Sequence, residues 1–398
     1  MKSIRGRCIQ ITASHLTIMS EGRISKHSFA PSAQSLSVKV GDLVKLEDQQ
    51  LSILTKQTSQ KSKLTERILH PRRLKTMRMR NSIEYATREF FINREFTEVR
   101  TPLLVRSSGM EAHIDPFQLK SGVFLPSSPE FAMKKLLVGG LEKIFQICPA
   151  FRDEPISAHH RPEFTMLEFY RAYSNDLAIQ EDVEQLVEFL AKKINNSAQI
   201  FYQGININVA TPWPRLKVNE LFKQHLDIDL NTENSLEKLR ARAQKLGTHT
   251  DKSDSWDEIY FRLWIERVEP RLPNDRAALV THYPRSQAAL ANLEHTSQGT
   301  WAKRFEAYIG GLELCNGFDE LTDAKEQRLR FEHEIELRKT IAAKSGASIS
   351  PIDEEFLEAL EEGLPPSGGV AVGLDRLIML FADEADIEYC FWLNPAVK

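Results

Sequence analysis

The sequence predicts an α+β protein: a sheet flanked by helices, preceded by a small N-terminal β module. Three observations predict this class. Residues 1–57 contain β-branched runs broken by turn signals. Residues 305–320 carry a Gly-Gly hairpin signal between two short β-prone runs. Apolar residues in 74–94 and 176–194 recur with helical spacing.

Length and composition predict two domains. The chain has 398 residues and 41% hydrophobic content, which is enough for a large core. We expect a small basic β module at residues 1–57, a polar linker at 58–69 and a larger domain at 70–398.

The sequence predicts neither a membrane span nor a secretion signal. It has no apolar run of about 18 residues, and the segment after Met1 is polar. Its cysteines lack metal-type spacing and are expected to be reduced thiols. We therefore expect a cytoplasmic protein with no membrane partner.

The N-terminal module is expected to form four or five short strands and, with turns between them, a small closed barrel of the oligonucleotide-binding (OB) type. The expected strands are Arg7–Ile11, His15–Met19, Ile24–Phe29, Leu43–Glu47 and Leu51–Thr55. Residues 1–80 hold 16 Lys and Arg against 5 Asp and Glu, a net charge of +11 in a chain of net charge −3. This asymmetry favours an acidic or polyanionic partner, although the charges could simply keep the module soluble.

Helical spacing and caps place the main elements of the larger domain. The expected elements are a helix at Leu74–Arg94, a short strand at Glu98–Thr101, a helix at Asp176–Ile194 capped by Asn175, a mainly helical stretch at 213–270 and a charged helix at Lys325–Ala343.

The hairpin at 305–320 predicts a pair of carboxylates. With Gly310-Gly311 as the turn, Tyr308 faces Glu313 and Glu306 faces Cys315. These four side chains then share one face, and Ala307, Ile309, Leu312 and Leu314 share the other, which we expect to be core. Two neighbouring carboxylates indicate a bound cation such as Mg²⁺, although a solvated hairpin with incidental acids is also possible.

Two further segments carry candidate binding groups. In the strand–loop–strand of residues 143–172, Phe164, Met166, Glu168 and Tyr170 share a face by alternation, which suits a base and a cationic side chain. Glu168 could instead pair with an arginine, and Tyr170 could be ordinary core. The Gly-rich segment 367–373 runs into a helix whose first turn holds Arg376, a candidate phosphate ligand.

Together these segments resemble motifs 1, 2 and 3 of class II aminoacyl-tRNA synthetases. The resemblance rests on the helix and strand before Pro102, on Phe151-Arg-Asp-Glu154 with His160 and Phe164, and on Gly373-x-Asp-Arg376. Three further stretches resemble the lysyl branch: Ser128-Pro-Glu130, Phe164–Tyr170 and Glu313–Glu320. Within that branch the chain is similar to the elongation factor P–(R)-β-lysine ligases, although a small N-terminal module is unusual for both groups. The resemblance implies an antiparallel sheet of six or seven strands and a homodimer formed through motif 1.

The resemblance also implies cofactors and roles for single residues. ATP would be bound by Arg152, Glu154, His160, Phe164, Glu306, Glu313 and Arg376. Among these, Arg152 would hold the α-phosphate and the substrate carboxylate, and Phe164 and Arg376 would enclose the adenine. Mg²⁺ would be held by Glu306 and Glu313, and the catalytic residues would be Arg152, Glu313 and Arg376.

For the amino acid, the resemblance implies a site that suits lysine or (R)-β-lysine. Its residues would be Ser128, Glu130, Glu168, Tyr170, Cys315, Asn316, Glu320 and Gly373. Glu168, Tyr170 and Glu320 would surround the ε-ammonium, Glu130 would face the second amine, and Asn316 would face the carboxylate.

Four residues depart from the lysyl pattern. His159 stands where an arginine directed at the γ-phosphate is usual, Arg161 replaces an asparagine, and Pro155 stiffens the loop. Cys315 replaces glycine or alanine, and the predicted hairpin register points its side chain into the site. We therefore expect Cys315 to influence the choice of lysine isomer.

Three functions remain open at this stage. The first is a ligase that adenylates a lysine-type amino acid and transfers it to elongation factor P. The second is a shortened lysyl-tRNA synthetase acting on tRNA, and the third is a catalytically idle paralogue with a regulatory role.

Overall fold

The computed structural model describes residues 3–32, 34–58, 68, 70–297 and 299–394, and most of the predicted linker lies outside this range. The chain forms two units, Met1–Met77 and Arg78–Lys398, each described below by itself. Every described helix is too short or too polar to cross a lipid bilayer.

All five predicted strands of the N-terminal module are present. They form one antiparallel sheet in the order β3-β2-β1-β4-β5. Their bounds are β1 Ile4–Ile11, β2 His15–Ser20, β3 Arg23–Ser28, β4 Leu43–Glu47 and β5 Gln50–Thr55, with a short 3₁₀ turn, η1, at Ser35–Ser37. Buried apolar side chains such as Leu16, Val44 and Leu51 fill its core. Among the described residues no strand ladder joins the two edge strands, β3 and β5. A single backbone hydrogen bond, from Ala30 N to Gln49 O at 2.8 Å, links the segment after β3 to the turn before β5.

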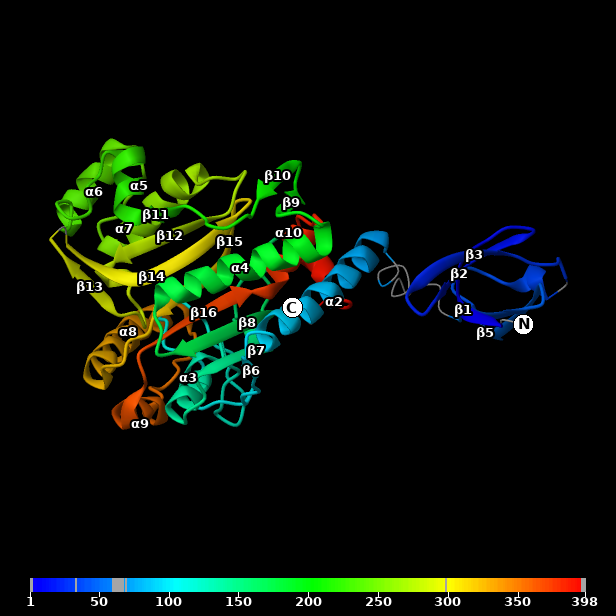
Figure 1. Cartoon of the computed structure of the whole chain (residues 1–398), viewed down its shortest axis with the longest axis horizontal. Helices are drawn as coiled ribbons and strands as arrows, with labels where there is room; N and C mark the ends of the chain where they lie inside the picture. The colour runs from blue at the N-terminus through cyan, green and yellow to red at the C-terminus, as the bar shows by residue number, and fades with distance from the viewer. Residues whose placement is uncertain (1–2, 33, 59–67, 69, 298, 395–398) are drawn as a thin grey trace. The chain divides into compact units, whose positions relative to one another are not determined.

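The second unit contains the predicted antiparallel sheet (Figure 1). Six strands pair antiparallel in the order β12-β14-β15-β16-β8-β7, and β11 and β6 extend the two edges as parallel strands. The strands are β6 Thr97–Glu98, β7 Lys143–Phe151, β8 Glu163–Ala172, β11 Arg215–Lys217, β12 Ala278–Pro284, β13 Leu293–Thr296, β14 Gly299–Ile309, β15 Leu312–Asp319 and β16 Ser367–Gly373, with a separate hairpin of β9 Gln199–Tyr202 and β10 Ile205–Asn208.

Helices surround the sheet in places close to the predicted ones. Their bounds are α2 Pro71–Ile92, α3 Glu130–Val138, α4 Asp176–Asn195, α5 Val218–Leu226, α6 Leu236–Lys245, α7 Trp256–Leu263, α8 Ala324–Ser345, α9 Glu354–Gly363 and α10 Leu374–Ala382. The side chain of Asn175 caps α4 by accepting from Ala178 N, as predicted. In Figure 1, α4 lies across one face of the sheet.

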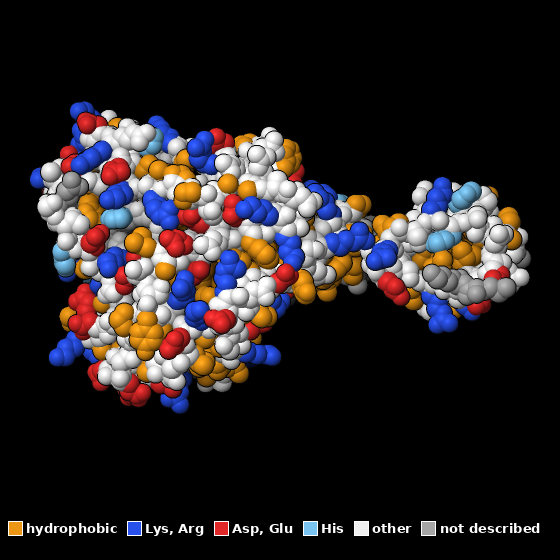
Figure 2. Space-filling model, in the orientation of Figure 1, with side chains coloured by type: hydrophobic (Ala, Val, Ile, Leu, Met, Phe, Trp, Pro, Cys, Tyr) orange, Lys and Arg blue, Asp and Glu red, His pale blue; other side chains and the backbone are white. Residues whose placement is uncertain are grey.

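The two faces of the sheet have different roles. One face packs with α4 and α10 into an apolar core, to which Leu167, Phe169, Ala307 and Ile309 contribute. Alternation puts Phe164, Met166 and Tyr170 on the other face, where α3, α8 and α9 lie around a cleft. On the molecular face drawn in Figure 2, acidic and basic side chains are interspersed over this unit.

The predicted hairpin is present, but its register is only partly correct. Tyr308 pairs with Glu313 as expected. A bulge at Leu314 then shifts the ladder, so Ala307 pairs with Cys315 and Glu306 pairs with Asn316. Leu314 and Cys315 therefore both face the core, and the predicted pairing of Glu306 with Cys315 is wrong.

Candidate active site

A cleft of about 1850 Å³ opens on the second face of the sheet. It brings together most of the predicted site residues, although they come from distant parts of the chain. The predicted residues that line it are Ser128, Glu130, Arg152, Glu154, His160, Phe164, Tyr170, Glu313, Cys315, Asn316, Glu320, Gly373 and Arg376. Glu168 and Glu306 are not in its wall; both are buried behind it.

One end of the cleft is formed by Arg376, which lies in the first turn of α10. Its guanidinium donates to Glu313 O at 2.7 Å and to His160 Nε2 at 2.8 Å. Partial desolvation and the neighbouring Arg376 charge lower the pKa of His160 to about 4. His160 is therefore neutral at pH 7, and Arg376 carries the positive charge at this position.

Arg152 is the second cation at this end. Its guanidinium lies 5.2 Å from the centre of the Phe164 ring, a cation–π contact. The buried Nε of Arg152 has no hydrogen-bond partner among the described residues. An unpartnered guanidinium nitrogen beside an aromatic face suits a ligand that brings both an anion and a ring.

Arg161, one of the residues that depart from the lysyl pattern, holds the loop before Phe164 in place through hydrogen bonds. It donates to the carbonyls of Ser157 and His160 and to Asp386 Oδ1 at 3.1 Å. Ile387 N also donates to Ala158 O at 2.8 Å. Arg161, which stands in place of an asparagine, therefore anchors the loop to the segment after α10.

Glu306 is more tightly bound than the sequence predicted. Oε1 of Glu306 accepts from Arg304 at 2.7 Å, and Oε2 accepts from Tyr283 at 2.6 Å and from Tyr308 at 2.8 Å. Arg304 also donates through Nε to Asn316 Oδ1 at 3.0 Å. Arg304 was missed in the sequence, although its two-residue spacing from Glu306 puts both on one face of β14.

Glu313 is the more available carboxylate of the predicted metal pair. Its nearest cation is Arg376, at 3.9 Å. Desolvation and the neighbouring Glu306 charge raise the pKa of Glu313 to about 7. Within the described parts of the chain, no three His, Cys, Asp or Glu side chains are grouped as metal ligands.

An acidic pocket forms the other end of the cleft, and it contains a lysine that sequence reasoning missed. The Lys134 ammonium is buried, 2.6 Å from Glu130 Oε1 and 2.5 Å from Glu320 Oε2. The two carboxylates hold the pKa of Lys134 above its usual range despite burial. Because Glu130 and Lys134 are four residues apart on α3, their spacing could have revealed this ion pair.

Glu168 and Tyr170 lie beside this pocket. Tyr170 donates its hydroxyl to Glu168 Oε2 at 2.9 Å. Burial, followed by repulsion from Glu130, raises the pKa of Glu168 to about 8, although bonds from Tyr170 and Ser128 act against this. An ionised Glu168 therefore needs a further cation nearby.

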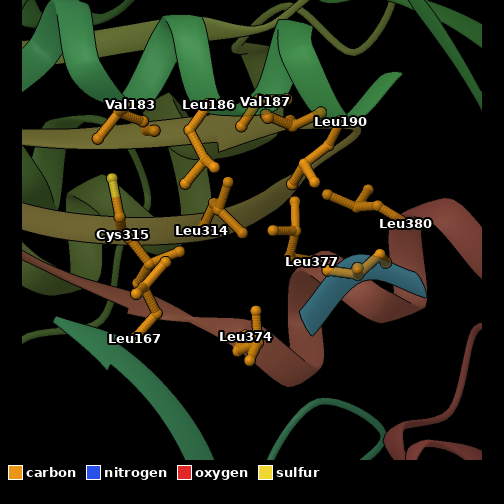
Figure 3. Packing of buried hydrophobic residues seen from close by; sticks show 14 of the residues in the cluster. Leu167, Val183, Leu186, Val187, Leu190, Leu314, Cys315, Leu374, Leu377 and Leu380 are labelled. Atoms are coloured by element: carbon orange, nitrogen blue, oxygen red, sulfur yellow. The ribbon is translucent and has the colours of Figure 1, made fainter. Parts of the chain in front are cut away.

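Cys315 lies along the cleft, but its side chain does not face it. Figure 3 shows its sulfur directed toward Val183 and Leu186 of α4, and it is 2% exposed within the apolar core. The prediction that this side chain points into the site is wrong because the bulge at Leu314 reverses its direction.

The comparison with known families identifies the class. The family model for class II tRNA synthetases (D, K and N) matches residues 58–393, so the chain belongs to this family. The antiparallel sheet and its cleft agree with the fold expected from motifs 1 to 3.

Relatives with two different names are similar to the chain. The lysine–tRNA ligase of Carboxydothermus hydrogenoformans is 35% identical over 326 residues, 80% of this chain and 65% of the relative. The elongation factor P–(R)-β-lysine ligase of Pectobacterium atrosepticum is 38% identical over 313 residues, 76% of this chain and 89% of the relative. The one of Pseudoalteromonas translucida is 38% identical over 325 residues, 79% of this chain and 93% of the relative. The chain is thus a member of the class II synthetase family, and it spans 65% of the length of the first of these lysine–tRNA ligases.

Proposed function

We propose that this protein uses ATP and Mg²⁺ to convert lysine or (R)-β-lysine into an aminoacyl-adenylate and transfers the acyl group to a lysine side chain of elongation factor P, with AMP as the leaving group. The observation that carries the proposal is a single cleft with an acidic pocket at one end and two arginines at the other. The relatives named elongation factor P–(R)-β-lysine ligase support the acceptor, since the match covers 89% and 93% of two of them.

The charge of the acidic pocket suits a diamino acid. Glu130, Glu168 and Glu320 supply three carboxylates, and Lys134 supplies one ammonium group. With all three carboxylates ionised, two negative charges remain, the number that two substrate ammonium groups would neutralise. Because buried charges need partners, an apolar amino acid would leave these carboxylates uncompensated.

The arginine end suits adenylate formation. Arg152 and Arg376 would hold the phosphates of ATP while a carboxylate oxygen of the amino acid attacks the α-phosphorus and pyrophosphate leaves. The Oδ1 atom of Asn316 is bound by Arg304, so the amide NH₂ group is left to donate to the substrate carboxylate.

The carboxylates near the arginine end fit a magnesium ion held partly by the nucleotide. Mg²⁺ is commonly bound through one or two carboxylates together with substrate phosphates. Glu313 is available for this role, and Glu306 would join it by loosening its contact with Arg304. When bound, Mg²⁺ would neutralise charge on the leaving pyrophosphate.

The charge of the cleft favours a cationic acceptor. Over the whole lining, ten Asp and Glu side chains outnumber six Arg side chains. Such a lining attracts a lysine side chain and disfavours the phosphates of a nucleic acid.

A lysine–tRNA ligase is the second candidate, favoured by the basic charge of the N-terminal residues. The deciding experiment offers labelled lysine or (R)-β-lysine, with ATP, to elongation factor P and, separately, to tRNA. We expect label on the protein. Label on tRNA alone would overturn the proposed acceptor.

A further inference from the structure

The side chain of a buried glutamine in α8 has no hydrogen-bond partner within the described part of the chain. Gln327 is 1% exposed, and neither Oε1 nor Nε2 finds a partner among the described residues. A buried amide without partners destabilises a folded protein, so such a group is uncommon unless a ligand completes it. Because Gln327 lines the cleft, a bound ligand can reach it.

The surroundings of Gln327 connect it with the acidic pocket. It shares the buried face of α8 with Phe331, whose ring lies 5.6 Å from that of Phe131 in α3. The same helix α3 carries Lys134, whose ammonium contacts Glu320. Gln327 therefore faces the helix that builds the amine end of the cleft.

Two carboxylate oxygens near this end also lack partners. Oε1 of Glu168 and Oε1 of Glu320 are buried and unpartnered within the described chain. Glu320 and Gln327 line the cleft and Glu168 lies behind its wall, so an ammonium group with three N–H donors would meet two open acceptors in the wall and a third carboxylate behind it.

We propose that Gln327 is a further substrate-contacting residue whose Oε1 accepts from the side-chain ammonium of the amino acid, beside Glu168 and Glu320. This inference rests on the proposed function. It makes Gln327 a determinant of specificity for an amine-bearing side chain over an apolar one of similar length.

The test compares Gln327→Met with Gln180→Met in the full-length protein. Gln180 lies in α4 and is also 1% exposed, but its amide donates to Asp176 at 2.9 Å and accepts from Arg215 at 3.1 Å. Thermal unfolding is measured without ligand, and KM is measured by pyrophosphate exchange with lysine and with norleucine, which lacks the side-chain amine.

The two variants should behave in opposite ways. Gln327→Met should raise the KM for lysine about 10-fold or more, because a hydrogen bond to a charged group is lost, and should leave norleucine unaffected. Its Tm should stay the same or rise, since an unpartnered amide is removed. Gln180→Met should lower Tm and leave both KM values unchanged.

Two results would overturn the assignment of Gln327 alone. One is wild-type exchange with an unchanged KM for lysine in Gln327→Met. The other is a lowered Tm in that variant, which would show that the amide has a structural role. A wild-type protein that exchanges with neither lysine isomer would overturn the proposed function, and this assignment with it.

Discussion

Substrate binding should release a proton from Glu168. In the free protein, burial and the charge of Glu130 raise the pKa of this carboxyl to about 8, with Tyr170, Ser128 and Lys134 as its other polar neighbours. A bound substrate ammonium stabilises the ionised form, so Glu168 must lose its proton when lysine binds.

The pKa sets the size of the effect. A carboxyl group with a pKa of about 8 is about 90% protonated at pH 7, so Glu168 should contribute about 0.9 proton there, in addition to any proton from Glu320, whose pKa burial also raises to about 8. Its ionised fraction rises from about 1% at pH 6 to about 50% at pH 8. The affinity for lysine should therefore increase about 50-fold between these pH values and level off above pH 8.

Isothermal titration calorimetry of lysine binding, in buffers with different ionisation enthalpies, measures the released protons directly. The matched variant is Glu168→Gln, which should bind lysine weakly and release no proton from this position. Proton release of the same size in both proteins, or an affinity that does not change between pH 6 and pH 8, would refute the reasoning.

Three further substitutions test separate parts of the site. Glu313→Ala should abolish pyrophosphate exchange but keep the protein folded by circular dichroism; wild-type rates would contradict its metal role. Lys134→Met should lower the free energy of unfolding, measured in urea, by about 3–5 kcal/mol, because Glu130 and Glu320 lose their buried partner. An unchanged free energy of unfolding would show that the ion pairs of Lys134 do not stabilise the fold. Cys315→Ala should leave the ratio of rates with α- and β-lysine unchanged, since its side chain packs in the core; a changed ratio would show that this residue affects isomer choice despite its direction.

The fold could largely be predicted because local signals agree with it. The turn at Gly310-Gly311 gave the first pair of the hairpin correctly. The rest of the register was predicted wrongly because a bulge breaks the two-residue alternation on which the prediction depended, so that Leu314 and Cys315 both face the core. Nothing in the alternation of Leu312–Cys315 marks that break.

Two charged residues of the site were missed for a different reason. Lys134 and Arg304 belong to elements whose charges are ordinarily solvated, and only the tertiary structure brings Glu320 to Lys134 and Asn316 to Arg304. Sequence spacing could suggest their local partners, but the long-range contacts depend on how the strands and helices pack.

The central claim is that the cleft activates a diamino acid. Pyrophosphate exchange with ATP, measured in parallel with α-lysine, (R)-β-lysine and norleucine, tests it most directly. We predict exchange that depends on a lysine isomer and is at least about 10-fold weaker in kcat/KM with norleucine. Exchange with neither isomer, as expected of an idle paralogue, or equal exchange with norleucine would contradict the account.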